Sequence, residues 1–392
     1  MKAKLEVPFF KPSFSEEEEQ AVLSVLRSGW LTTGKEAAEF EREFASFLGA
    51  GQALAVNSAS SGLLLAMEAF GVRPGTCIVT TPYTFISTAT AAMHLGAEVL
   101  YCDIEEDSYN IDPQKVEDML RSRKNIRAVV PVHVAGNLCR MDAIKPCAER
   151  YHAAVIEDAA HAFPANGPDG FAGTLGDAGV FSFYTTKTIT TGEGGMITLR
   201  DPGKAETVKR LRANGISREV WDRYTNPAAS WKYDVTCCGW KCNLPDLLAA
   251  IGRVQLKKAG RFLARRKAIA ETYNRSFASC GFLRLPPDSP GNAWHLYLLR
   301  IQPEKLTVGR DEFARLLQNE GLGISVHFIP HFDFTFIRRT SGLSRDSFPE
   351  AAKKADCTVS LPFWPDMRDE EIQYVIDTVK KIGEQYYRKS CF

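Results

Sequence analysis

One aspartate and one lysine close two apolar runs and form the most informative pair in the sequence. Ala153–Ile156 and Val180–Phe183 have the pattern of short buried strands, so Asp158 lies at the carboxyl end of the first and Lys187 just beyond the second. In α/β folds, ligands bind at this edge of the sheet. A lysine that forms a Schiff base and an aspartate that keeps a pyridine nitrogen protonated are the protein groups used in pyridoxal phosphate (PLP) chemistry. The pair therefore predicts a PLP site.

Each of these residues alone has a plainer explanation. Asp158 could cap a helix, and Lys187 could be a solvated surface residue. The combination with Ser182 and with the glycines of Thr191–Gly195 favours the catalytic interpretation.

A phosphate site is predicted where a strand meets a helix. Asn57–Gly62 follows an apolar run and opens the helix expected at Leu63–Phe70, so Ser60 and Ser61 are placed to hold a phosphate at the positive end of that helix. As simple helix caps they would look the same. Ser182, near Lys187, could donate to the same phosphate. The sequence has neither a Walker loop nor a Gly-x-Gly-x-x-Gly motif after its first strand, which argues against nucleoside triphosphate and nicotinamide chemistry.

A cofactor ring also needs a flat face to lie against. Phe85, in the segment Thr84–Thr88 after an expected strand, could supply it, and a place in the core is the alternative.

Length and composition are those of an ordinary globular protein. The chain has 392 residues, of which 45% are hydrophobic and 24% charged, and a formal net charge of +1. We expect two domains, and no nucleic-acid or membrane partner, because no long basic run or apolar segment of spanning length occurs. The first residues lack the apolar core of a signal peptide, so a cytoplasmic location is expected.

The 10 cysteines are scattered, as expected for reduced thiols in a large chain. Cys237, Cys238 and Cys242 form the one cluster. No further cysteine pair or histidine pair with suitable spacing accompanies it, so no metal site is predicted.

The apolar pattern predicts an α/β domain over most of the first half. Ser15 and Glu18 form a capping box for a helix that stops at Gly29, and Phe40, Phe44 and Phe47 recur at helical spacing as core residues of a second helix. Short apolar runs then alternate with amphipathic segments, which predicts a mostly parallel, seven-stranded sheet covered by helices. The expected strands are Ala53–Val56, Cys77–Thr80, Glu98–Cys102, Ala128–Val132, Ala153–Ile156, Val180–Phe183 and Met196–Leu199.

The pattern changes after Asp201. A polar loop over 214–240 is longer than a connector needs, which favours a functional or inter-subunit role, and precedes a long helix, Pro245–Ser279. The buried positions expected in this helix are Ala249, Ile251, Val254 and Leu256. Strands at His295–Ile301 and Gly323–Phe328 and helices at Arg310–Asn319 and Asp369–Gln385 predict a smaller α+β domain. We place the domains at 13–250 and 251–392, and residues 1–12 could pack with the second.

Several longer motifs carry a family resemblance that covers nearly the whole chain. The chain resembles the DegT/DnrJ/EryC1/StrS sugar aminotransferases, which are fold type I PLP enzymes, and within them the nucleotide-sugar 4-aminotransferases of the UDP-4-amino-4-deoxy-L-arabinose synthase type. Besides the segments around Asp158 and Lys187, the motifs are Gly29–Gly34, Pro131–Gly136, Gly239–Leu244, Ala293–Leu296 and Leu361–Asp366.

The resemblance implies a role for each candidate residue. Lys187 would be the Schiff-base lysine, Asp158 the partner of the pyridinium nitrogen, and His161 a neighbour of the ring's 3-oxygen. The remaining implied roles are ring stacking by Phe85, phosphate binding by Ser60 and Ser182, phosphate binding from the second subunit of a homodimer by Asn243, and sugar-nucleotide contacts by Trp30 and His327. The implied substrates are a nucleotide-linked keto sugar, with C4 preferred over C3 as the aminated position, and an amino-acid donor, with glutamate expected.

The sequence departs from the family's usual pattern in three places. Ala59–Ser60 replaces Gly-Thr, Thr185 replaces proline, and Cys242 replaces an aromatic residue near the substrate side of the site. Only the last makes the sugar harder to identify. Sugar dehydratases of the same fold carry histidine at the lysine position, and a silent binding protein would have lost Asp158 or Lys187, so both alternatives are disfavoured.

Overall fold

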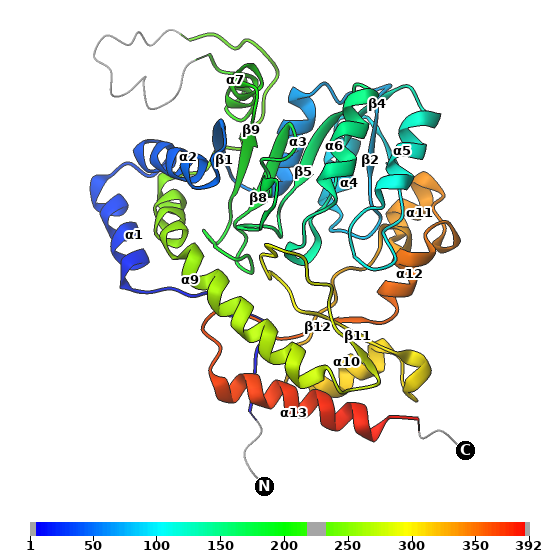
Figure 1. The fold of residues 1–392 in the computed structure, drawn as a ribbon. Coiled ribbons are helices and arrows are strands. Elements are labelled where there is room, and N and C mark those ends of the chain that lie inside the picture. Colours follow the sequence, from blue (N-terminus) through cyan, green and yellow to red (C-terminus); the bar gives the residue numbers. More distant parts are fainter. Residues whose placement is uncertain (1–4, 218–232, 389–392) are drawn as a thin grey trace.

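A seven-stranded sheet forms the centre of the larger part of the molecule (Figure 1). The structure is a computed structural model that describes residues 5–217 and 233–388. Strand β9 is antiparallel to both of its neighbours, β1 and β8, and all other neighbouring strands are parallel. The strand order is β1-β9-β8-β5-β4-β2-β3, and the bounds are Gln52–Val56 (β1), Cys77–Thr80 (β2), Glu98–Tyr101 (β3), Ile126–Val129 (β4), Ala154–Asp158 (β5), Ala178–Ser182 (β8) and Gly195–Leu199 (β9). Each predicted strand overlaps one of these, which confirms the mostly parallel sheet.

Helices cover both faces of this sheet because its strands are apolar on both faces. Ile78 packs into the core shared with α3 and α4, whereas Cys77 and Val79 pack on the opposite side against α5 and α6. Alternate residues of one strand therefore serve two cores. One face carries α3 (Ala59–Ala69), α4 (Ser87–His94) and α7 (Pro202–Leu211), and the other carries α2 (Lys35–Leu48), α5 (Pro113–Ser122) and α6 (Met141–Arg150).

The first two helices largely match their sequence signals. Helix α1 (Glu16–Ser28) begins at the predicted capping box, in which Ser15 N donates to Glu18 at 2.9 Å, and ends at Gly29, whose φ of 73° is left-handed. In α2 the rings of Phe40 and Phe44 are buried, but the prediction that Phe47 is a core residue is wrong, because its side chain is 38% exposed. Phe47 lies at the margin of the core, where its ring contacts those of Phe163 and Phe171.

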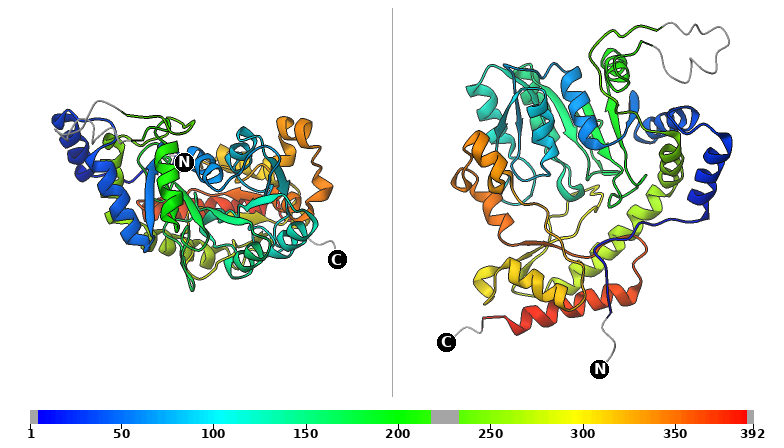
Figure 2. Two further views of the ribbon diagram at one scale, coloured as in Figure 1. Left: turned by 90° about the horizontal axis from the view of Figure 1, so that it is seen from above. Right: turned by 180° about the vertical axis from the view of Figure 1, so that it is seen from behind.

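The long predicted helix is confirmed as α9 (Asp246–Phe277), which at 1.5 Å per residue spans about 48 Å. It runs from the sheet to the smaller C-terminal part of the molecule (Figure 1; Figure 2). Ala249 and Leu256 are buried as expected, but Ile251 and Val254 are only partly buried. The buried stripe of the helix runs instead through Ala249, Gly252, Gln255, Leu256 and Ala259.

The C-terminal part contains a three-stranded antiparallel sheet in the order β10-β11-β12. The predicted strand Gly323–Phe328 is wrong. Its residues bond to separate single partners, since Gly323 N donates to Val7 O and Ser325 pairs with Ser360, so no ladder forms. The strands of this sheet are Leu283–Arg284 (β10), Leu298–Ile301 (β11) and Thr358–Ser360 (β12). The helices of the C-terminal part are Arg310–Asn319 (α10), Thr335–Ser341 (α11), Pro349–Ala355 (α12) and Asp369–Gln385 (α13). The larger part also contains a small hairpin of Asn166–Gly167 (β6) and Gly170–Phe171 (β7).

The predicted strand at His295–Ile301 begins only at Leu298. The main chain before it turns back toward the segment that follows β4, where His295 N donates to Ala135 O at 3.0 Å. The predicted domain boundary at residue 250 lies within α9, and the division into two domains stays a prediction. Residues 218–232 of the predicted polar loop lie outside the described residues. Within the described chain, no helix has the length and apolar character needed to span a bilayer.

Candidate active site

A cavity of about 520 Å³ lies where β5 and β8 end, at the carboxyl edge of the large sheet. This is where parallel α/β sheets place their ligands. Seven of the residues predicted from sequence line it, namely Ser60, Phe85, Asp158, His161, Ser182, Lys187 and His327. The cavity thus brings together residues separated by more than half of the chain.

Asp158 is the last residue of β5 and is only 4% exposed. One carboxylate oxygen, Oδ2, accepts a hydrogen bond of 2.7 Å from Thr88 Oγ1, and Oδ1 accepts one of 3.2 Å from Ala160 N. Burial raises the pKa of this carboxyl group, while those two hydrogen bonds and the charge of Lys187 act in the opposite direction. The donors fix the orientation of the carboxylate at the base of the cavity.

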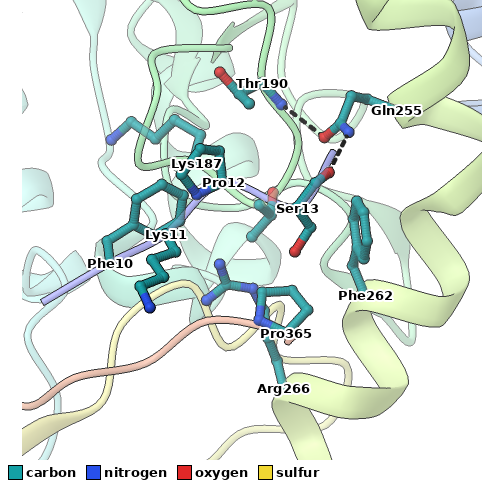
Figure 3. Close-up of a pocket in the computed structure, with 11 residues that line it drawn as sticks. Phe10, Lys11, Pro12, Ser13, Lys187, Thr190, Gln255, Phe262, Arg266 and Pro365 are labelled. Carbon is teal, nitrogen blue, oxygen red and sulfur yellow. Dashed lines mark hydrogen bonds between the residues drawn. The ribbon is translucent and has the colours of Figure 1, made fainter. Parts of the chain in front are cut away.

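Lys187 follows β8 in a loop that is tied down on both sides. Lys187 N donates to Tyr184 O, and Thr190 Oγ1 donates to Phe183 O, both at 2.9 Å. Gln255 on α9 accepts from Thr190 N at 3.4 Å (Figure 3). Desolvation lowers the pKa of Lys187 to about 8, although the charge of Asp158 raises it. About a tenth of this amine is therefore unprotonated and nucleophilic at pH 7, far more than of an ordinary lysine with a pKa of about 10.4.

The start of α3 supplies donors at another wall of the cavity. Ser58 is the N-cap, and its Oγ accepts from Ser61 N at 3.1 Å, so the helix starts earlier than predicted and Ser60 lies in its first turn. The opening amides of a helix have no partner within it. A Cβ on Gly195 would come within 2.8 Å of Ala59 N, so glycine is needed for β9 to approach this turn so closely. The geometry suits an anion such as a phosphate.

Aromatic and imidazole rings complete the lining. The ring of Phe85 is 60% exposed, which excludes the alternative that it is a core residue. Burial lowers the pKa of His161 well below its usual value and that of His327 to about 4, and the charge of Lys187 adds to both effects. His295 is buried beside His161 with ring centroids 4.4 Å apart, and burial lowers its pKa in the same way. All three imidazoles are neutral at pH 7.

Three predicted site residues, Ser61, Asn243 and Trp30, are not among those that line this cavity. Ser61 Oγ lies 3.0 Å from Ser58 Oγ. Asn243 lines a second cavity of about 530 Å³, where its Nδ2 donates to Thr33 Oγ1 at 2.5 Å. Trp30 Nε1 donates to Thr33 O at 3.3 Å, so the segments around Trp30 and Asn243 meet each other rather than Lys187.

Sequence reasoning missed three residues that line or support the cavity. Thr88 had no signal of its own, because only the fold brings its hydroxyl on α4 to Asp158 at the end of β5. Ser58 belongs to the segment Asn57–Gly62, but a helix expected to begin at Leu63 gives it no capping role. His295 is visible in the sequence only as part of the motif Ala293–Leu296. Among the described residues, no group of three or more histidine, cysteine, aspartate or glutamate side chains is arranged to hold a metal ion.

The donor set fits PLP. An amine of lowered pKa, a buried carboxylate, an exposed aromatic face and a helix start bearing hydroxyl groups are what a cofactor with an aldehyde, a pyridine ring and a phosphate would need. All of them border one cavity, and its volume is in the range of small-molecule sites.

Comparison with known proteins agrees with this arrangement. The model of the DegT/DnrJ/EryC1/StrS aminotransferase family matches residues 12–380. The chain is 41% identical over 379 residues to the spore coat polysaccharide biosynthesis protein SpsC of Bacillus subtilis strain 168, covering 96% of this chain and 97% of that protein.

Solved structures of sugar aminotransferases have the same fold. Spr1654 of Streptococcus pneumoniae, which is assigned as a sugar aminotransferase, matches in its PLP form with a TM-score of 0.90 and 26% identity over 97% of this chain and 99% of that chain. PseC of Helicobacter pylori, an aminotransferase involved in the biosynthesis of pseudoaminic acid, matches with a TM-score of 0.90 and 26% identity over 97% and 100%. Spr1654 is also solved in a PMP form, so both amine-exchange states of the cofactor are represented. The chain therefore belongs to the DegT/DnrJ/EryC1/StrS aminotransferase family, has the fold of its sugar aminotransferases, and is PLP-dependent.

Proposed function

We propose that this enzyme transfers the amino group of an L-amino acid, with glutamate as the expected donor, to the C4 keto group of a nucleotide-linked sugar. The observation that carries the proposal is the cavity in which Lys187, Asp158 and Phe85 meet the start of α3. Membership of a sugar aminotransferase family supports the reaction type. The nucleotide, the C4 position, the donor and the cytoplasmic location are parts of the proposal.

Lys187 would be the nucleophile and the proton carrier. An ordinary lysine amine has a pKa of about 10.4 and is almost entirely protonated at pH 7. Desolvation brings the pKa of Lys187 to about 8, so its neutral amine would be available to hold an aldehyde cofactor covalently. Once displaced by the donor, the amine would take the proton from the donor's α-carbon and return it to the cofactor side.

Asp158 would hold the proton on the pyridine nitrogen of the cofactor. When bound, PLP supplies a conjugated, cationic ring over which the negative charge developing at the donor's α-carbon is spread. Asp158 can stabilise that cation only as a carboxylate, and burial works against this because it raises the carboxyl pKa. The hydrogen bond from Thr88 favours the charged form, which makes Thr88 a positioning residue for Asp158.

The other predicted residues would bind and orient. Ser60, Ser61 and Ser182 are proposed phosphate ligands, although Ser61 is not among the residues that line the cavity in this chain. Phe85 would stack on the ring, and His161, neutral and beside Ala135 N at 3.4 Å, would contact its 3-oxygen. Trp30 and His327 are proposed to contact the sugar nucleotide.

Two considerations support a homodimer with shared sites and a role in polysaccharide synthesis. Asn243 lines a different cavity from Lys187 in its own chain, so the proposed phosphate contact of Asn243 requires a second subunit. The relative SpsC is described as a spore coat polysaccharide biosynthesis protein, which supports a cell-surface polysaccharide as the end product.

The first prediction tests the reaction itself. Holoenzyme supplied with glutamate and with UDP-, GDP- or dTDP-linked 4-keto and 3-keto sugars should aminate a 4-keto substrate, as detected by mass spectrometry of the product. Lys187→Ala is the matched control and should give no product. Amination of 3-keto sugars alone would move the proposal to C3, and no amination of any keto sugar would overturn it.

The second prediction concerns the amine of Lys187 in the protein freed of cofactor. Only the neutral amine reacts, so the rate of acetimidate labelling of the Lys187 peptide should rise with pH and reach half its maximum near pH 8. The charge of Asp158 raises this pKa, so Asp158→Asn should move the midpoint to lower pH. A midpoint near pH 10, like that of a free lysine in the same reaction, would contradict the assignment.

The third prediction separates Thr88 from a purely structural role. Thr88→Val removes one hydrogen bond to a charged group, so kcat should fall about 10- to 100-fold and the pH titration of the bound cofactor's absorbance should shift. Thr88→Ser should restore both, and Asp158→Asn should lower kcat further. Thr90→Val, on the same helix but bonded to Ile86 O, is the control. A normal cofactor titration in Thr88→Val would rule the role out.

The fourth prediction tests site sharing. Lys187→Ala and Asn243→Asp, each inactive alone, are unfolded together, refolded and assayed. If each site uses residues from both chains, about half the dimers are mixed with one intact site each, and activity should return to about a quarter of wild type. Mixed dimers without activity, verified by native mass spectrometry, would place Asn243 in its own chain's site.

A further inference from the structure

Two sequence motifs, Pro131–Gly136 and Ala293–Leu296, are joined to each other beside the active-site cavity. His295, which lines the cavity, donates from its main-chain N to Ala135 O at 3.0 Å. The two main chains lie so close that a Cβ on Gly136 would come within 2.8 Å of an atom in the main chain of the second motif. We call the two joined motifs the clamp.

Each half of the clamp contains a residue in a strained backbone conformation. The φ angles of Ala135 and Trp294 are 59° and 48°, in the left-handed region that residues other than glycine rarely adopt. The described chain has four such residues, and two of them meet in the clamp. Strain of this kind persists only where the surrounding contacts impose it, and it is concentrated at functional sites.

Three side chains from separate parts of the chain hold the clamp in this conformation. Asn292, just before the second motif, accepts at Oδ1 from Trp294 N at 2.8 Å, and Asn110 Oδ1 accepts from Val134 N at 3.0 Å. Arg266 on α9 (Figure 3) is 1% exposed, and its Nη1 donates to Trp294 O at 3.3 Å. The strained turns are therefore fixed on both sides.

The conformation of Ala135 directs its main-chain N–H at the ring of His161. Ala135 N donates to His161 Nδ1 at 3.4 Å, so Nδ1 must carry a lone pair, because a proton on it would face the N–H. Burial and the charge of Lys187 lower the pKa of His161 well below its usual value, so the ring is neutral and its one proton is on Nε2. Nε2 has no partner among the described residues and is available to a ligand in the cavity.

Two neighbouring rings keep the imidazole of His161 from turning over. Phe328 stacks on it with the ring centroids 5.3 Å apart and 21° between the planes, and the ring of His295 packs against it at 4.4 Å and 61°. A half-turn of the imidazole would exchange Nδ1 with a carbon atom, and these close contacts hinder it. Since His295 Nδ1 has no hydrogen-bond partner in the described chain, this nitrogen of His295 does not compete for the proton of His161.

We propose that the clamp holds His161 in the tautomer with its proton on Nε2, which makes His161 a hydrogen-bond donor and Ala135 and Asn292 its positioning residues. The ligand atom that suits this donor is an oxygen carrying negative charge, toward which the opposite tautomer would turn a lone pair. In the proposed function, on which this assignment rests, that atom is the 3-oxygen of PLP. His161 orients the cofactor and leaves proton transfer to Lys187.

NMR spectra of the full-length protein carrying ¹⁵N-labelled histidine test the tautomer directly. The His161→Gln variant identifies the signals of His161 by their loss. At neutral pH, both with PLP and after its removal, we expect an unprotonated Nδ1 and a protonated Nε2. A proton on Nδ1, or two exchanging tautomers once PLP is removed, would overturn the proposal, because the clamp would then not set the tautomer.

Variants of Asn292 test whether the clamp acts on His161. Asn292→Ala removes the acceptor from Trp294 N, so the signals of His161 should move toward those of exchanging tautomers, and the PLP dissociation constant should rise about tenfold. Asn292→Asp keeps the acceptor and should restore both. Asp201→Ala, the control, loses a bond of the same kind from Gly203 N at the start of α7 and should leave His161 unchanged. Wild-type signals of His161 in folded Asn292→Ala would refute the clamp.

A cofactor analogue distinguishes failure of this inference from failure of the proposed function. PLP should shift the Nε2 signal of His161, whereas 3-deoxypyridoxal phosphate, which lacks the 3-oxygen, should not. Equal shifts with both compounds, or a shift with neither, would overturn the contact with the 3-oxygen. The amination of keto sugars is measured separately, so a fixed tautomer and a PLP-specific shift without amination would count against the proposed function alone.

Discussion

The parallel pairing of β5 with β8 is the constraint on which the site depends. Its register sets Asp158 beside Val180, so the chain leaves both strands at the same edge and the lysine loop begins next to the carboxylate. The pairing requires a close crossing, because a Cβ on Gly179 would lie 2.2 Å from Gly173 Cα. Glu157 supports the crossing by accepting hydrogen bonds from Gly173 N at 2.8 Å and Gly176 N at 2.6 Å.

The same burial that shapes the cavity pushes its two charged groups toward neutrality. It raises the pKa of Asp158 and lowers that of Lys187, and their mutual attraction opposes both shifts. The neighbouring side chain of Glu157 is also buried, but its hydrogen-bonding needs are met within the protein. Its partner His133 is also fully buried, and His133 Nδ1 accepts a hydrogen bond of 3.0 Å from Cys139 N while His133 Nε2 lies 2.8 Å from Glu157 Oε2, so both ring nitrogens have partners within the protein. Asp158 and Lys187 face the cavity, and the free-energy cost of burying their charges is only partly offset by their mutual attraction. A ligand with complementary groups lowers that cost.

The sequence correctly predicted the elements that are determined by local residue patterns. Apolar runs located the strands, and the box at Ser15 and the glycine at 29 located both ends of α1, because caps and strand alternation are properties of neighbouring residues. Prediction from sequence failed where contacts between residues far apart in the chain determine the structure. Segment 323–328 looks like a strand, yet its main chain bonds to Val7 and Ser360 separately, and Phe47 keeps helical spacing but lies where the core ends. Thr88 belongs to the site only because α4 carries its hydroxyl to Asp158.

The segment around Trp30 and the segment around Asn243 form a unit of their own, far apart in sequence and joined through Asp246. The carboxylate of Asp246 accepts from Gly34 N at 2.7 Å and Ala37 N at 3.0 Å, which satisfies the start of α2 from the first turn of α9. Thr33 Oγ1 in turn donates to Leu244 O at 2.6 Å. The segments that carry Asn243 and Trp30 are therefore held to the same helix start by hydrogen bonds. If a second chain completes the site, this coupling delivers the proposed phosphate contact and the proposed sugar contact together, so that cofactor and substrate are held by one rigid element of the partner.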